Sequence, residues 1–329
     1  MKENEIRPEA LYKRYIELSH EDAEHCFGDE ERFHVACVAC GSLKNTNEFV
    51  KYGFQYVTCR GCQSLYQSPR PSLLAFESFY KNSVSSNYWA DVFFPAVAEI
   101  RRDLIFRSRV DQLSAMVKES GDKIERLVDV GAGYGIFLDE WRKHDPKARL
   151  IAVEPSESLA AECRHKGFET SENIAEEVEG YDDFADLVVC FEVLEHVFDP
   201  LSFVKSLTRL ARPGGLVFLS TLSIDGFDLQ FLWDKSKQIS PPHHINFLSV
   251  DGFKKLFERA GLTDISVTTP GKLDVDIVRN SCLENPDLID GQRFIQKLMD
   301  QSDLRDSFQA FLAENALSSH VWVIGRLPL

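Results

Sequence analysis

Residues 128–135 have the sequence Val-Asp-Val-Gly-Ala-Gly-Tyr-Gly, in which a short apolar strand runs directly into three glycines. A helical pattern follows over residues 136–141. Glycine lets the backbone turn tightly and approach a ligand closely, and the start of a helix offers free N–H groups. The third glycine of the dinucleotide fingerprint is replaced here by Ile136, so the spacing favours a different nucleoside ligand.

A second apolar strand, residues 149–153, ends at Glu154, about 20 residues beyond the glycines. A carboxylate in this position accepts hydrogen bonds from both ribose hydroxyls of a nucleoside. A glycine turn alone is often a plain connector, and a single acidic strand end means little. Their order and spacing together predict a nucleoside site.

Further strand-like and helix-like segments alternate around this pair. The apolar segments 185–190, 216–220, 264–267 and 321–325 predict strands, and residues 249–260 predict a helix. This alternation indicates an α/β fold with parallel, buried central strands joined by crossover helices. Residues 276–316 are expected to form a mostly helical insertion before the last strand.

Four motifs in this part of the chain resemble those of the class I S-adenosylmethionine-dependent methyltransferases. They are residues 128–135, 153–156 (Val-Glu-Pro-Ser), 190–197 (Cys-Phe-Glu-Val-Leu-Glu-His-Val) and 212–215 (Arg-Pro-Gly-Gly). The resemblance covers about residues 100–329. It implies a Rossmann-like seven-stranded sheet whose last strand, residues 320–326, is antiparallel to the others.

The resemblance also implies which residues bind the cofactor. The glycines would lie along its methionine part, Glu154 would hold the ribose, and two residues after the 185–190 strand would line the methionine side. The full set is Asp129, Gly131, Gly133, Gly135, Glu154, Pro155, Phe191 and Glu192. Because the sulfonium is already an activated leaving group, the main tasks left to the protein are positioning the acceptor and removing its proton.

Two pairs of cysteines lie ahead of this region, Cys37 with Cys40 and Cys59 with Cys62. The spacing C-x2-C-x18-C-x2-C is typical of a tetrahedral zinc site with four thiolates. With all four positions taken by protein, the zinc is expected to be structural and the module to resemble a zinc ribbon. Redox chemistry of one cysteine pair is the alternative.

A histidine-rich segment, Pro-Pro-His-His-Ile-Asn-Phe at residues 241–247, follows the 216–223 strand and is expected at the carboxyl edge of the sheet, where ligands bind in such folds. His243 or His244 is the candidate general base, because histidine titrates near neutral pH. The alternative is that the two histidines brace the turn before the next helix.

Glu192, Glu195 and His196 form an E-x-x-E-H cluster. His196 is a further catalytic candidate, and the cluster could bind a divalent metal, as is thought for quinone-type methyltransferases with a similar cluster; simple packing of His196 beside the cofactor is the alternative. Weaker candidates for walls of the acceptor pocket are Tyr88, Trp89, Asp274, Asp276 and His320.

Length and composition indicate how the chain is divided into domains and which kinds of partner are disfavoured. Residues 1–95 are expected to hold a helix, the zinc module and a connecting segment without clear periodicity, and residues 96–329 the methyltransferase domain. The net charge of −15, from 37 basic and 52 acidic residues, disfavours nucleic acid and anionic membranes as partners. No signal peptide or long apolar run is seen, so a cytoplasmic location is expected.

A cysteine module ahead of a methyltransferase core, together with the histidine segment, is similar to bacterial sugar C-methyltransferases. This similarity implies methylation of a small molecule, such as a nucleotide-linked sugar. Two alternatives stay open: an RNA methyltransferase whose zinc module binds RNA, and a non-catalytic protein that binds S-adenosylmethionine and docks a partner.

Overall fold

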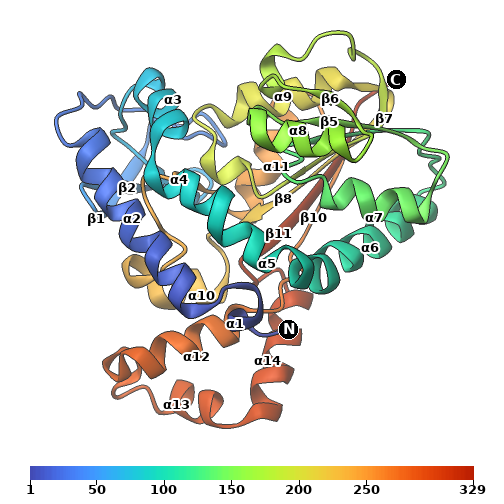
Figure 1. The fold of residues 1–329 in the computed structure, drawn as a ribbon. Coiled ribbons are helices and arrows are strands. Elements are labelled where there is room, and N and C mark those ends of the chain that lie inside the picture. The colour runs from blue at the N-terminus through green and yellow to red at the C-terminus, as the bar shows by residue number, and fades with distance from the viewer.

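A seven-stranded sheet forms the centre of the molecule in the computed structural model, which describes all of residues 1–329 (Figure 1). Its order is β10-β11-β8-β7-β4-β5-β6, with β11 antiparallel to both neighbours and the other pairs parallel. The strands are β4 (Arg126–Val130), β5 (Arg149–Val153), β6 (Glu169–Ser171), β7 (Ala185–Phe191), β8 (Ala211–Leu222), β10 (Thr263–Thr268) and β11 (His320–Arg326). The predicted α/β class and antiparallel last strand are confirmed; β6 was not predicted.

Helices cover both faces of this sheet because its strands are apolar on both sides. One face packs against α6 (Arg107–Glu119), α7 (Ile136–His144) and α8 (Glu157–His165). The other packs against α9 (Pro200–Leu210) and α11 (Val250–Arg259). Successive residues of a strand point to opposite faces of the sheet. In β4, Leu127 packs in the core on the first face and Val128 in the core on the second. Two short 3-10 turns, η3 (Ala175–Glu177) and η4 (Leu194–His196), flank β7.

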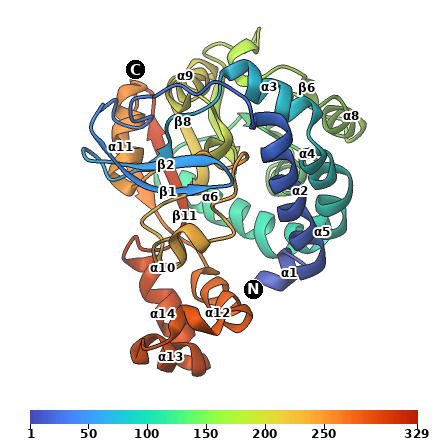
Figure 2. The same ribbon diagram turned by 90° about the vertical axis from the view of Figure 1, so that its left-hand side faces the viewer.

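A smaller antiparallel sheet carries the four cysteines and lies beside α11 (Figure 2). Its order is β1 (Asn45–Lys51), β2 (Phe54–Cys59), β3 (Leu65–Gln67) and β9 (Asn246–Phe247). The fourth strand therefore comes from the part of the chain that follows β8. Helices α1 (Glu3–Ile6) and α2 (Glu9–Phe27) precede this sheet. The division of the chain at residue 95 stays a prediction, and strand pairing crosses it.

The segment at residues 69–95, expected to be a connecting segment without clear periodicity, is mostly helical. It holds α3 (Leu73–Asn82), α4 (Val84–Tyr88), the π-helix η1 (Trp89–Phe93) and the start of α5 (Phe94–Arg101), and a second π-helix η2 (Arg102–Phe106) leads into α6. Its aromatic rings pack in several directions, which hides the helical period. Local signals were present, since Ser72 and Ser83 each cap a helix amino terminus.

A helical lobe projects below the rest of the molecule in Figure 1. It comprises α12 (Asp274–Glu284), η6 (Pro286–Ile289), α13 (Arg293–Asp300) and α14 (Ser302–Glu314), and packs on α10 (Phe227–Leu232), which leads into η5 (Trp233–Lys235). Helix α1 docks on the lobe, where Glu3 N donates to Asp276 Oδ2 at 2.8 Å. Every helix in the structure is too short or too polar to cross a membrane.

Candidate active site

The glycine loop between β4 and α7 is tied to β5 and leaves space open beside it. The N–H groups of Gly131 and Ala132 donate to the Val153 carbonyl at 2.8 and 3.2 Å. The φ angles of Gly131, Gly133 and Gly135 are 75°, 54° and 65°, in the region that favours glycine. A Cβ added at Gly133 would meet no atom within 4 Å. The backbone at Gly133 is therefore accessible to a ligand.

Alanine at Gly131 should be markedly destabilising, because its Cβ would lie 2.7 Å from Val193 Cγ2 in addition to the left-handed strain. Gly121 is a matched control with φ 79° and nothing within 4 Å of an added Cβ. We expect Gly121→Ala to cost about 1–2 kcal/mol of unfolding free energy from strain alone, and Gly131→Ala about 1–3 kcal/mol more. Urea denaturation measures both; equal costs would show that the contact with Val193 relaxes freely.

Glu154 and Asp129 present buried carboxylates beside the loop. Glu154 Oε2 accepts from Gly133 N at 2.8 Å, and its Oε1 accepts from Ser156 N at 2.9 Å. Asp129 Oδ1 is buried and has no hydrogen-bond donor. Burial, and then the charge of Glu154, raise the pKa of Asp129 to about 8. An unsatisfied buried acceptor of this kind suits a ligand that brings a donor or a positive charge. Pro155 is exposed just beyond Glu154.

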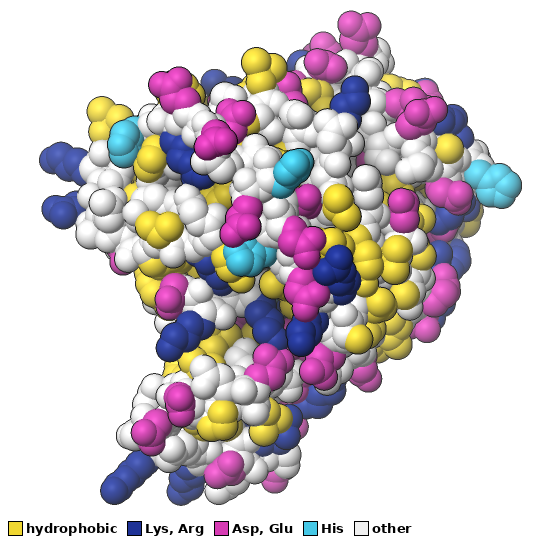
Figure 3. All heavy atoms as spheres, turned by 60° about the vertical axis from the view of Figure 1, so that its left-hand side comes forward, with side chains coloured by type: hydrophobic (Ala, Val, Ile, Leu, Met, Phe, Trp, Pro, Cys, Tyr) yellow, Lys and Arg dark blue, Asp and Glu magenta, His cyan; other side chains and the backbone are white.

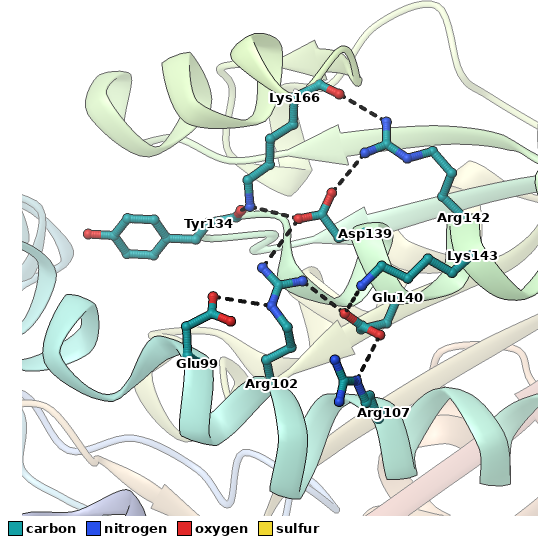
Figure 4. Close-up of polar contacts among 9 residues, drawn as sticks. All are labelled: Glu99, Arg102, Arg107, Tyr134, Asp139, Glu140, Arg142, Lys143 and Lys166. Carbon is teal, nitrogen blue, oxygen red and sulfur yellow. Dashed lines mark hydrogen bonds and ion pairs between the residues drawn. The ribbon is translucent and has the colours of Figure 1, made fainter.

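Ion pairs on the outer side of α7 hold the loop in place (Figure 4). Lys166 Nζ donates to the Tyr134 carbonyl at 2.5 Å and pairs with Asp139 at 2.9 Å. Arg102 bridges the same Asp139 at 3.5 Å and Glu140 at 2.9 Å. These contacts connect the loop residue Tyr134 and helix α7 to Lys166 and Arg102, which fixes their position.

Glu192 follows β7 in a left-handed conformation, with φ 55°. Its Oε1 accepts from Arg109 Nη2 at 2.6 Å and from Ser220 Oγ at 2.6 Å, and lies 3.0 Å from His320 Nε2. Burial would raise the pKa of Glu192, but His320 and Arg109 outweigh it and hold the pKa well below its usual range. Phe191 packs against aromatic rings of α7 and β8. Glu192 is thus a fixed negative charge at the carboxyl edge of the sheet.

His243 is enclosed and engaged by a neighbouring hydroxyl. Its Nε2 lies 2.8 Å from Ser85 Oγ, which donates to Asp22 Oδ2 at 2.5 Å. Only 4% of the residue is exposed, and burial lowers its pKa to about 3. Three aromatic side chains surround the ring, those of Tyr15, Phe79 and Tyr80. This arrangement matches the bracing alternative better than a base in contact with an acceptor.

His196, His244 and Glu195 converge at the same edge. Each histidine has its Nδ1 against a carbonyl oxygen, of His243 at 3.0 Å and of Gln238 at 2.6 Å respectively. A carbonyl only accepts, so both Nδ1 atoms carry the proton and both Nε2 atoms keep a lone pair. One ligand atom from each of the three residues lies within 4.8 Å of the others. Glu192 is not part of this group.

The electrostatics of this trio follow from burial. Burial lowers the pKa of His244 to about 4 and that of His196 well below its usual range, so both rings are neutral near pH 7. Burial, and then the charge of Glu192, raise the pKa of Glu195 to about 8, although Thr221 donates to its Oε2 at 2.6 Å. The trio offers two neutral imidazole lone pairs and a carboxyl group, which could accept a proton or hold a divalent cation.

The four cysteines meet as their spacing predicts. The Sγ atoms of Cys37 and Cys62 are 3.5 Å apart, as are those of Cys40 and Cys59, and all four lie within 4.8 Å of one another. A tetrahedral zinc site with bonds of about 2.3 Å needs sulfur atoms roughly 3.8 Å apart. Gly61 N donates to Cys59 Sγ at 3.2 Å, as in a zinc knuckle. The donor set therefore fits zinc.

The cysteine module also holds the histidine segment. Tyr56 Oη of β2 donates to the His244 carbonyl at 2.6 Å, and Gln67 N donates to the Ile245 carbonyl at 2.9 Å. On the other side, Arg259 of α11 donates to the Ala39 carbonyl between the first two cysteines at 2.6 Å. The cysteine module is therefore hydrogen-bonded to the segment that carries His244.

Three arginines near the site were missed from the sequence. Arg7, Arg101 and Arg109 line a cavity next to Glu192; Arg7 directly follows α1, Arg101 ends α5 and Arg109 lies in α6. Arg101 and Arg109 belong to the arginine-rich stretch of residues 101–109, a signal that could have pointed to them, whereas Arg7 is distant in the chain. Of the weaker candidates, Asp274 and His320 line this cavity, whereas Tyr88, Trp89 and Asp276 do not.

Comparison with known proteins identifies the family to which this chain is similar. A family model described as a methyltransferase domain matches residues 97–267, from α5 to β10. Ubiquinone biosynthesis O-methyltransferase of Xanthomonas oryzae is 34% identical over 122 residues, 35% of this chain and 49% of that protein. The same enzyme of Methylococcus capsulatus is 40% identical over 108 residues, 30% of this chain and 44% of that protein. The chain thus spans about half the length of these curated relatives.

Among solved structures, the plantazolicin methyltransferase BpumL, in complex with a pentazolic desmethylPZN analogue and SAH, has a TM-score of 0.50 with this chain. The match covers 77% of this chain and 95% of that one, at 12% identity. At this identity the likeness concerns the fold alone.

Proposed function

The chain belongs to the methyltransferase domain family, and on that premise we propose that it transfers the methyl group of S-adenosylmethionine to a hydroxyl oxygen of a small molecule. The name O-methyltransferase, carried by the relatives described above, supports oxygen as the target atom. The observation that carries the proposal is the open space at Gly133, beyond the end of β4, which lies beside the buried carboxylate of Glu154 at the end of β5. We call this part of the structure the cofactor cradle.

The residues of this cradle fit the cofactor. In our proposal Glu154 accepts the ribose hydroxyls, the accessible backbone of Gly133 allows close approach, and Asp129 Oδ1 is the free acceptor for a donor of the methionine part. Glu192, held by Arg109 and His320, fixes a negative charge on the methionine side. S-adenosylmethionine supplies a methyl group activated by its positive sulfur.

We propose His244, with His196 beside it, as the group that takes the proton of the acceptor hydroxyl. Both rings have a free Nε2 lone pair and a Nδ1–H fixed on a carbonyl, whereas the Nε2 of His243 is engaged by Ser85. A base must lie within hydrogen-bonding reach of the proton it removes, which the free Nε2 atoms allow.

The same three donors favour a second role, a site for a divalent cation. A histidine that binds a metal commonly donates its other N–H to a carbonyl, as His196 and His244 do. Titration with Mn2+ separates the two roles. Binding of about one equivalent that is lost in His244→Ala assigns the trio to a cation; no binding leaves the proton-accepting role.

A labelling experiment tests the proposed function. The protein is incubated with methyl-labelled S-adenosylmethionine and, separately, catechols and other phenols, nucleotide sugars and total RNA. We expect label on a phenolic oxygen, with His244→Ala lowering kcat by roughly 10²–10⁴-fold while the Kd for the cofactor is unchanged. The exposed His165 provides a control, since His165→Ala should keep full activity.

Other outcomes would replace the proposal with one of its rivals. Label on a sugar carbon would support the nucleotide-sugar acceptor expected from the C-methyltransferase similarity. Label only in RNA would assign the cysteine module to RNA binding. Tight cofactor binding without any transfer would indicate a protein that senses S-adenosylmethionine.

A further inference from the structure

A cavity of about 120 Å³ lies between the body of the molecule and the helical lobe, next to Glu192. Its wall includes residues of α1, α5, α6, α12 and β11, and it reaches the surface near the exposed Lys272. Figure 3 shows Lys and Arg side chains gathered in the hollow above the lobe. The cavity is therefore close to the candidate active site and basic at its mouth.

Arginine nitrogens in this wall lack acceptors. Nε and Nη1 of Arg101 are buried without a hydrogen-bond partner, as are Nη1 of Arg7 and Nε of Arg109. Burial, and then the like charges of Arg7 and Arg109, lower the pKa of Arg101 to about 10. Its neighbour Arg102 differs sharply, because carboxylates lie within 3.5 Å of its Nε, Nη1 and Nη2 (Figure 4).

The two acids in the wall already have hydrogen-bond partners. Both oxygens of Asp274 accept hydrogen bonds, from Ser318 Oγ at 2.5 Å and from Ser319 N at 2.6 Å among others. Glu192 is held by Arg109 and His320. Arg7 has one distant ion pair, 3.8 Å to Glu3. In a protein with a net charge of −15, the wall of this cavity thus holds more basic than acidic side chains, and the buried Nε and Nη1 of Arg101 have no carboxylate partner.

The position of the cavity connects it to the proposed base. Gln238 lines the cavity, and its carbonyl accepts from His244 Nδ1 at 2.6 Å. Glu192 lines the cavity as well. A molecule that occupies the cavity therefore lies beside Glu192, and Gln238 alone links it to His244.

Building on the proposed function, we propose that this cavity binds an anionic group of the methyl acceptor, a carboxylate or a phosphate, through Arg101 and Arg7. Guanidinium groups donate charge-assisted hydrogen bonds to these planar or tetrahedral anions, and two nitrogens of Arg101, Nε and Nη1, are buried without an acceptor. The volume of about 120 Å³ suits one such group with part of a ring. The acceptor is then an anionic hydroxyl compound, anchored at one end and methylated at the other.

Calorimetry on the SAH-loaded protein tests this directly with two probe pairs that differ only in charge: 3,4-dihydroxybenzoate with catechol, and phenyl phosphate with phenol. We expect the anion of at least one pair to bind roughly tenfold to hundredfold more tightly than its neutral partner. Arg101→Gln should abolish this difference, and Arg101→Lys should retain part of it. Arg107→Gln, which removes an arginine with a half-exposed side chain on the same helical run, should leave it unchanged.

Several outcomes would overturn the inference. They are equal binding within both pairs, no binding of either anion, or a preference for the anion that survives in Arg101→Gln. A rise in the Kd for SAH itself in Arg101→Gln would show that the arginines hold the carboxylate of the cofactor instead. Because these are binding measurements, they stand apart from the labelling experiment: methyl transfer to a neutral phenol with no preference for anions would leave the proposed function intact.

Discussion

Replacement of Glu154 by alanine is expected to raise the Kd for S-adenosylmethionine by roughly 10²–10⁴-fold, as measured by calorimetry. Two hydrogen bonds from ribose hydroxyls to a carboxylate are each worth about 1.5–3 kcal/mol, and both would be lost. The effect should be large because Glu154 is only 6% exposed and already orders Gly133 and Ser156 through their N–H groups. Its removal leaves those donors without an acceptor.

Glu157 provides the control for this substitution. It lies three residues further on, in the first turn of α8, and is exposed. Glu157→Ala removes the same charge and should leave the Kd for the cofactor within about twofold of the wild type, because surface substitutions away from such contacts have small effects. Equal losses in the two variants would indicate a general electrostatic effect and contradict the assignment of Glu154.

Substitution of Cys62 by serine is expected to remove zinc, lower the thermal stability and abolish methyl transfer together. Structural zinc contributes on the order of 10 kcal/mol in small zinc domains, although part of this will be retained here by packing on α11. Activity should fall because β3 pairs with β9, next to His244. Metal analysis, thermal unfolding and the labelling assay measure the three effects.

Cys26 is the matched control, a half-buried thiol on α2 outside the cluster. Cys26→Ser should keep the zinc content and the activity of the wild type. A Cys62→Ser protein that lacks zinc but remains stable and fully active would show that the cluster neither folds the module nor supports the histidine segment.

The sequence was most informative where a local pattern reflects burial on both faces of the central sheet. Strands such as β4 and β7 are almost wholly buried, and the glycines and Glu154 follow their strands at recognisable spacing. β6 was missed because it is a three-residue edge strand, Glu169–Ser171, with polar side chains. Its pairing with β5, rather than its composition, makes it a strand.

The site depended on contacts that no local pattern encodes. His243 and His244 are adjacent, yet one is bonded to Ser85 and the other to the Gln238 carbonyl, and only the tertiary structure separates them. Similarly, Arg7 and Arg101 are far apart in the chain and become neighbours only because α1 packs against α5. The residue type was enough to select the histidines as candidates. Their hydrogen-bond partners, however, are set by the tertiary packing.

The pairing of Leu65 with Phe247 joins residues 182 positions apart, since 247 − 65 = 182. During synthesis at about 5–20 residues per second, the first three strands of the small sheet would therefore leave the ribosome roughly 10–40 s before their fourth strand exists. Over that interval the edge of β3 is unpaired and open to association with other chains. Binding of zinc to the cysteine pairs, which lie within 26 residues of one another, is available much earlier and would keep this early intermediate compact.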